Sequence, residues 1–219
     1  MYLIYNIITF FIKNLESQPL SQKSPFSGNV YKSPAQISNM PRYKKDINYL
    51  TQLDDSLAYI TALINNIDCL EYRAYIATIY LTGARPIEMS LLKRESVKIT
   101  DDSVLISIET AKNGYPRTLH FSRETPLLEG HILPFWATLN EEERAFKKHV
   151  STYKKMIYRV SGNRLTPYTF RHHRMTKLSM LGAKDQELKY WKGARSTKSI
   201  EPYIHYSGIM VEKFKNKIM

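Results

Sequence analysis

A change of hydrophobic period part-way along the chain constrains its fold most. Between residues 46 and 92, apolar side chains recur every three or four residues, which is typical of amphipathic helices. From Val97 they alternate instead, and Asn113-Gly114, a strong turn signal, separates two alternating runs. Helical periodicity then returns in four segments, 140–160, 168–182, 184–192 and 196–206. The sequence therefore predicts a mainly α domain with one small antiparallel β-sheet, an α+β fold.

One junction between two predicted helices contains side chains suited to catalysis or to binding an anion. The helix predicted from Leu70 closes at Gly83, a residue that favours helix ends, and the next helix begins at Pro86, which favours first turns. Arg85 lies between the two. We expect this junction to hold the guanidinium in a fixed pose, with Glu88 one turn later as its orienting partner, although a purely structural ion pair would give the same pattern.

The first 45 residues differ from the rest. The apolar run over residues 1–14 is too short to span a bilayer, and it lacks the basic start and cleavage site of a signal peptide. It predicts a short helix that packs on the body or on a second copy, or alternatively a helix for a membrane surface or partner. Residues 16–45 are rich in Ser, Pro and Gln, as flexible linkers are. We therefore divide the chain into 1–45, an apolar helix and linker, and 46–219, a folded domain with a further helix after Gly208.

Positive charge is concentrated at the C-terminal end. The chain carries 32 Lys and Arg against 20 Asp and Glu, a net charge of +12. Residues 151–219 hold 15 of the basic side chains and only four acidic ones. Such an excess of basic residues indicates a polyanionic partner, for which nucleic acid is the first candidate. We expect the last third of the chain to bind it.

Several other chemistries are not expected. The single cysteine, Cys69, excludes an intramolecular disulfide and a thiolate zinc cluster and favours an intracellular protein. The sequence contains no glycine-rich phosphate loop, no HExxH and no GxSxG. His172 and His173 would point about 100° apart on a helix, so a shared metal site is not expected. A solvated or phosphate-facing pair is the better interpretation.

Three segments, 81–97, 110–121 and 166–207, resemble in their order and spacing the catalytic domain of the tyrosine recombinases, the phage-type integrase superfamily. The family's first box is matched by Thr82 to Met89, and its hairpin-lysine motif by the run from Lys112 to Leu119. Its second box is matched by Tyr168 to His172, and its third by Lys192-Gly193-Ala194. The nucleophile follows nine residues later in the family, which is Tyr203 here.

The resemblance implies a tyrosine recombinase catalytic domain over 46–219 that cleaves and rejoins DNA through a 3′-phosphotyrosine. Arg85 and Arg171 would hold the scissile phosphate, Lys112 would protonate the leaving 5′-oxygen, and Tyr203 would attack phosphorus. No metal, cofactor or nucleotide is implied. The implied partners are double-stranded DNA and three further copies in a tetramer, with no membrane, in the cytoplasm of a host cell.

Two positions depart from the family pattern. Tyr168 replaces the usual His or Lys of the second box, and Ala194 replaces the His or Trp of the third. Arg195 is the candidate to supply the lost donor. We expect activity, because the core set of Arg, Lys, Arg and Tyr is intact. The alternatives are a weak or inactive DNA-binding integrase remnant and a type IB topoisomerase-like enzyme.

Size is a third departure. Family members usually carry a helical core-binding domain before the catalytic one, and 45 linker-like residues are too few to form it. A catalytic fragment, a truncated gene product or a minimal integrase of an archaeal virus or plasmid would each fit this size.

Overall fold

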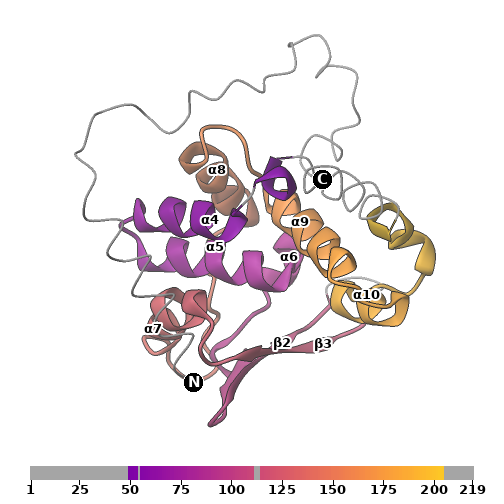
Figure 1. The fold of residues 1–219 in the computed structure, drawn as a ribbon. Helices are drawn as coiled ribbons and strands as arrows, with labels where there is room; N and C mark the ends of the chain where they lie inside the picture. Colours follow the sequence, from indigo (N-terminus) through magenta and orange to yellow (C-terminus); the bar gives the residue numbers. More distant parts are fainter. Residues whose placement is uncertain (1–48, 54, 111–113, 205–219) are drawn as a thin grey trace, which may run out of the picture. The chain divides into compact units, whose positions relative to one another are not determined.

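The computed structural model describes residues 49–53, 55–110 and 114–204, and helix α5 is central to the helices among them. This helix spans Leu70–Thr82, and most of its side chains are buried. It packs against α4 (Ser56–Asn65), α8 (Val150–Val160) and α9 (Pro167–Met180) (Figure 1). Gly83 ends α5 with a φ of 61°, in the left-handed region that favours glycine. Both ends of α5 are those predicted from the sequence.

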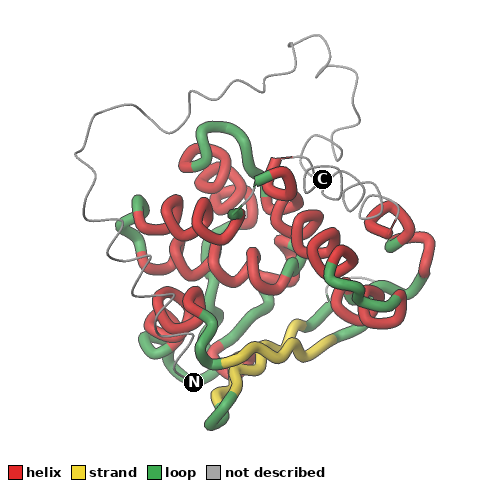
Figure 2. Tube along the Cα trace, viewed as in Figure 1, coloured by secondary structure: helices red, strands yellow, loops and turns green. Residues whose placement is uncertain are grey.

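The sheet has three antiparallel strands in the order β1-β2-β3 (Figure 2). Strand β1 spans Val97–Ile99, β2 Ser103–Ile108 and β3 Arg117–Ser122. The alternation predicted from the sequence is present, because Val104, Ile106 and Ile108 are buried while the residues between them are partly exposed. Ile106 is paired with Leu119, so one apolar face covers the core. The predicted fold class, mainly α with a small antiparallel sheet, is confirmed.

Short elements connect the main ones. They are α6 (Pro86–Met89), the 3-10 turns η1 (Arg94–Ser96) and η3 (Thr197–Ser199), the π-helical turn η2 (Leu128–Ile132), α7 (Leu133–Trp136) and α10 (Asp185–Lys192). Residues 201–204 are helical again. Among the described residues, no helix is both long and apolar enough to cross a bilayer.

Three predicted helices differ from what their periodicity suggested. The pattern over 196–206 is divided, within the described residues, between the 3-10 turn η3 and the helical residues 201–204. The helix expected over 140–160 begins only at Val150, because the backbone before it makes other bonds: the amide of Ala145 donates to the Leu92 carbonyl at 2.8 Å. The helical pattern that starts at Asp46 is interrupted before Ser56, where the Asp55 side chain accepts a hydrogen bond from the Ala58 amide at 2.9 Å and caps α4.

A small second core lies at the C-terminal end of the described chain. It consists of Met175, Leu188, Ile200 and Tyr203, with Trp191 packed against both this core and the main one. Residues of α9, α10 and the segment after η3 therefore pack together, which fixes the ring of Tyr203, 4% exposed, against α9.

Several predictions fall outside the described residues. They are the N-terminal helix and linker, the division at residues 45 and 46, the turn that contains Lys112, and the tail helix after Gly208.

Candidate active site

Arg85 lies at the junction of α5 and α6 and is held by Glu88. Its backbone is extended, with φ −72° and ψ 150°, and Pro86 opens α6 directly after it. Glu88 accepts the Arg85 amide at 2.8 Å through Oε2 and the guanidinium Nη1 at 2.5 Å through Oε1. The ion pair expected from the sequence is therefore present, and it leaves the Arg85 side chain 32% exposed.

Glu88 is also the partner of a second, fully buried arginine. Arg117, the first residue of β3, donates from Nη2 to Glu88 Oε2 at 2.9 Å. Burial raises the pKa of Glu88, but the hydrogen bond and charge of Arg117, the Arg85 amide and the charge of Arg171 lower it further, and the net shift is downward. Nε and Nη1 of Arg117 have no hydrogen-bond partner among the described residues.

Arg117 fits only because residue 193 is glycine. A Cβ on Gly193 would lie 2.6 Å from Arg117 Nη1, and the φ of Gly193 is +61°. The third box therefore packs directly on the hairpin strand through a glycine.

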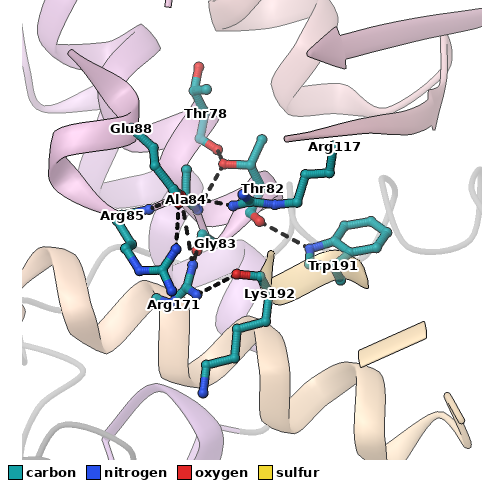
Figure 3. A network of polar contacts seen from close by, with 10 residues as sticks. All are labelled: Thr78, Thr82, Gly83, Ala84, Arg85, Glu88, Arg117, Arg171, Trp191 and Lys192. Atoms are coloured by element: carbon teal, nitrogen blue, oxygen red, sulfur yellow. Dashed lines mark hydrogen bonds and ion pairs between the residues drawn. The ribbon is translucent and has the colours of Figure 1, made fainter. Parts of the chain in front are cut away.

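Arg171 joins the first box to the third. It lies on α9 with its side chain 4% exposed, and it donates from Nη1 to the Gly83 carbonyl and from Nη2 to the Lys192 carbonyl, both at 2.7 Å (Figure 3). Its Nη1 is 3.9 Å from Glu88 Oε2. Burial and the charge of Arg85 lower the pKa of Arg171 to about 10, so the guanidinium remains charged at neutral pH.

Lys192 is a cation that sequence reasoning did not single out. It is the last residue of α10, its Nζ donates to the Ser199 carbonyl, and the same atom lies 4.7 Å from the centroid of the Tyr203 ring. Burial lowers the pKa of Lys192 to about 8, and the charges of Arg171 and Arg85 add to this effect. Its only sequence signal was a basic residue directly before Gly193 in the third box.

Tyr203 is close to these cations and is hydrogen-bonded to a histidine. Its Oη lies 2.8 Å from Nδ1 of His172. Burial raises the pKa of Tyr203, and the charges of Arg171 and Arg85 oppose that shift. Burial, followed by the charges of Lys192 and Arg171, lowers the pKa of His172 to about 4. At neutral pH the pair consists of a neutral phenol and a neutral imidazole.

The structure therefore brings Arg85, Arg171 and Tyr203 together, as the sequence motifs require. We call Arg85, Arg117, Arg171 and Lys192 the cation cluster. Three of these cations, the arginines, have a guanidinium nitrogen within 4.0 Å of one described carboxylate, Glu88, and the charges of Arg171 and Arg85 act on the fourth, Lys192. The cluster therefore carries excess positive charge and suits an anion.

Two other sequence candidates lie differently. Tyr168, on the first turn of α9, is 54% exposed. The Arg195 guanidinium lies over the Tyr115 ring at 5.5 Å from its centroid. Within the described part of the chain, no hydrogen bond or ion pair joins either residue to Arg85, Arg171 or Tyr203. The role of Arg195 as the substitute for the third-box donor stays a prediction, whereas Lys192 Nζ lies 4.7 Å from the centroid of the Tyr203 ring.

Lys112 itself is outside the described residues, but Gly114 and Tyr115, which follow it in the chain, lie close to the site. The amide of Tyr115 donates to the Gly193 carbonyl at 3.4 Å. A Cβ built on Gly114 would lie 2.7 Å from the same carbonyl and 3.7 Å from Arg85 Nη1. The segment that begins at Gly114 therefore contacts the third box and lies near Arg85 of the first.

No protein-family model and no curated protein matches this sequence. Solved structures do match its fold, which is that of the tyrosine recombinase catalytic domain. XerA recombinase is similar with a TM-score of 0.57 at 18% identity, over 99% of this chain and 74% of XerA. XerH site-specific recombinase bound to difH substrate, in a pre-cleavage complex, gives 0.54 at 16% identity over 68% of this chain.

The Tn1549 transposon integrase in complex with transposon right end DNA gives a TM-score of 0.52 at 14% identity, over 88% of this chain and 64% of the integrase. The similarity spans 48% of the XerH chain, about half of its length. At these identities the comparisons show a shared fold. The activity of this chain has to be argued from its own residues.

Proposed function

We propose that this chain cleaves and rejoins DNA strands through a covalent 3′-phosphotyrosine, as the catalytic domain of a site-specific recombinase or integrase. The observation that carries the proposal is that the Tyr203 phenol lies within the electrostatic influence of Arg85 and Arg171, with Lys192 Nζ 4.7 Å from its ring centroid. Cations grouped around a phenol provide both an anion site and a nucleophile for the same phosphate.

The guanidiniums would bind the non-bridging oxygens of the scissile phosphate. A guanidinium has five N–H donors, and the structure uses one on each terminal nitrogen of Arg171 for main-chain carbonyls. The remaining donors of Arg171, and those of the partly exposed Arg85, are available to phosphate. Because Glu88 and the main chain fix both groups before DNA arrives, little reorganisation is needed as negative charge develops.

The chemical step is an in-line displacement at phosphorus. The Oη of Tyr203 forms the new P–O bond, and the bond from phosphorus to the 5′-oxygen breaks. Lys112, on the hairpin turn, is proposed as the acid that protonates that oxygen. Attack by a 5′-hydroxyl on the phosphotyrosine then rejoins a strand. The ester conserves the energy of the phosphodiester bond, so neither metal nor nucleotide is required.

The partners follow from charge and from the proposed reaction. Double-stranded DNA is the substrate, and the 15 basic side chains of residues 151–219 supply phosphate contacts that make binding strongly salt-dependent. Exchange between two duplexes requires one nucleophile for each of four strands, so we propose that a tetramer of this chain acts on DNA.

Covalent trapping tests the proposal. The protein is incubated in EDTA with a pool of nicked duplexes of random sequence, in which cleavage near the nick releases a short fragment and prevents rejoining. We expect a denaturant-resistant protein–DNA species, with peptide mapping placing DNA on Tyr203. A mobility shift without that species would contradict the proposal.

That contrary outcome would favour the DNA-binding remnant, which Ala194 and the exposed Tyr168 also support. Relaxation of supercoiled plasmid by a covalently competent protein that never joins two duplexes would instead favour the topoisomerase-like alternative.

A further inference from the structure

The hydroxyl of Tyr203 has a specific polar partner with no role so far. His172 Nδ1 lies 2.8 Å from Tyr203 Oη, and the two rings are 5.5 Å apart between centroids, tilted by 36°. We propose that His172 is the general base of cleavage, taking the phenol proton at Nδ1. This inference rests on the proposed function, in which Tyr203 is the nucleophile.

The fold holds the two groups in this relation from both sides. Successive residues of a helix point about 100° apart, so α9 directs Arg171 toward the Gly83 and Lys192 carbonyls while His172 faces Tyr203. The Tyr203 ring is fixed in the second core with Met175 and Leu188. A base and a nucleophile held at hydrogen-bond distance by packed elements meet the geometric requirement for proton transfer.

The charges around His172 make it a proton acceptor in the free protein. After burial, Lys192 from α10 and Arg171 from α9 are the groups that hold its imidazole neutral. A scissile phosphate bound by the same cations would offset their charge and raise the basicity of His172. The base would therefore become stronger only when substrate is in place.

Tyr168 stands where the family usually has a second-box His or Lys, and its phenol is poorly suited to act as the base. Its side chain is 54% exposed, and a phenol is a poor base near neutral pH. His172 supplies an imidazole that contacts the reacting oxygen directly.

The proposed step balances. As the Tyr203 Oη–P bond forms, its proton moves to His172 Nδ1 and the P–O5′ bond breaks, with the 5′-oxygen protonated by Lys112 as proposed above. His172 is then an imidazolium. In rejoining, a 5′-hydroxyl attacks phosphorus, the Oη–P bond breaks, and His172 returns the proton to Oη.

The first test is His172→Asn, because an asparagine oxygen can accept the phenol hydrogen bond near the Nδ1 position but cannot take the proton. We expect the rate of covalent-complex formation to fall about 10²-fold or more, with unchanged DNA affinity. The remaining rate should rise about tenfold per pH unit between pH 6 and 8, because hydroxide replaces the base. A near wild-type rate for His172→Asn would show that His172 only positions Tyr203 and would overturn the proposal.

His173→Asn is the matched control. His173 is also a buried imidazole on α9, but it faces Ser56, whose Oγ is 3.1 Å from its Nε2. Cleavage per folded molecule should stay within about threefold of wild type. An equal loss in both variants would mean that the effect arises from α9 as a whole, against the proposal.

A second measurement does not depend on cleavage or on the stability of a variant. Nitrogen-15 NMR of histidine-labelled wild-type protein reads which ring nitrogen carries the proton. We expect His172 as the Nε2–H tautomer, with an Nδ1 signal that shifts in Tyr203→Phe. A proton on Nδ1 would overturn the proposal. If the wild type forms no covalent complex, the proposed function fails. The NMR spectrum still reports, independently of that outcome, whether His172 Nδ1 accepts the hydrogen bond of the Tyr203 hydroxyl.

Discussion

Arg171 donates from Nη2 to the main-chain carbonyl of Lys192 at 2.7 Å, so a candidate phosphate-binding arginine also anchors the end of α10. Trp191 anchors the same end to α5, donating from Nε1 to the Thr82 carbonyl at 3.0 Å. The third box is thus attached to the first through two side chains. Substitutions at Arg171 will therefore move Lys192 as well as remove a charge.

Arg85→Ala and Arg171→Ala should each slow covalent-complex formation about 10²-fold, a loss of about 3 kcal/mol or more in transition-state stabilisation. Arg171→Ala should lower the melting temperature more than Arg85→Ala does, because it leaves two main-chain carbonyls without donors, whereas Arg85→Ala leaves Glu88 paired with Arg117. Single-turnover cleavage and calorimetry measure the two effects. Lys93→Ala is the control, since the one ion pair of the Lys93 side chain among the described residues is with exposed Glu95, at 3.4 Å. Equal melting temperatures for the two arginine variants would contradict the anchoring role.

Lys112→Ala should be slow on normal DNA and largely restored on DNA with sulfur in place of the bridging 5′-oxygen. A thiolate leaves without a proton, so the acid is no longer needed. Arg85→Ala should gain nothing from the sulfur substrate. Wild-type speed of Lys112→Ala on normal DNA would place the acid elsewhere, with Arg117 the nearby basic candidate.

Tyr203→Phe should form no covalent complex while its DNA affinity stays close to that of wild type, because only one hydroxyl is lost. Filter binding and denaturing gels give the two readouts. Tyr206→Phe is the control, since Tyr206 is the nearest other tyrosine in the sequence. Loss of the complex in Tyr206→Phe, with retention in Tyr203→Phe, would show that the nucleophile is misassigned.

Cleavage at limiting DNA should decline above pH 8. Burial, Arg171 and Arg85 lower the pKa of Lys192 to about 8, so the free protein loses this cation as the pH rises through that value. Saturating DNA should move the decline to higher pH, because bound phosphate favours the charged amine. Lys192→Arg stays charged and should remove the decline. If the decline in cleavage persists in Lys192→Arg, another titrating group causes it and the prediction is wrong.

Glu88→Gln should lower the free energy of unfolding by about 3–5 kcal/mol, because it leaves the fully buried guanidinium of Arg117 without a counter-charge. Urea unfolding measures the loss. Glu95→Gln removes an exposed ion pair with Lys93 and should cost under about 1 kcal/mol. Similar losses in the two variants would contradict the role assigned to Glu88.

Local sequence signals predicted the framework of the site. Gly83 and Pro86 mark a helix end and a helix start, and these fix the backbone of Arg85 by short-range effects alone. The alternating strands around Asn113-Gly114 were predicted for the same reason. The motif spacing singled out Tyr203 as the candidate nucleophile, and the second core packs its ring with Met175 and Leu188.

The parts that were missed depend on contacts between distant segments. Lys192 acquires its significance only when α10 docks on Arg171, and the contact of His172 with Tyr203 joins residues 31 apart in sequence. The segment 140–149 has a helical pattern, but the Leu92 carbonyl takes the Ala145 amide. The η2 and α7 turns gave no clear periodic signal, although Leu128, Ile132 and Trp136 are buried there.

The cation cluster also bears on how the fold responds to salts. The three arginines around Glu88 and the nearby Lys192 repel one another in the free protein, and this repulsion opposes folding. A multivalent anion bound there relieves it and binds the native state alone, so native stability becomes linked to anion concentration. Sulfate or a short oligonucleotide is an anion of this kind, and its binding would stabilise the native state. Under the proposed function, a DNA phosphate is the anion that supplies this stabilisation, so the domain would be more stable on DNA than alone.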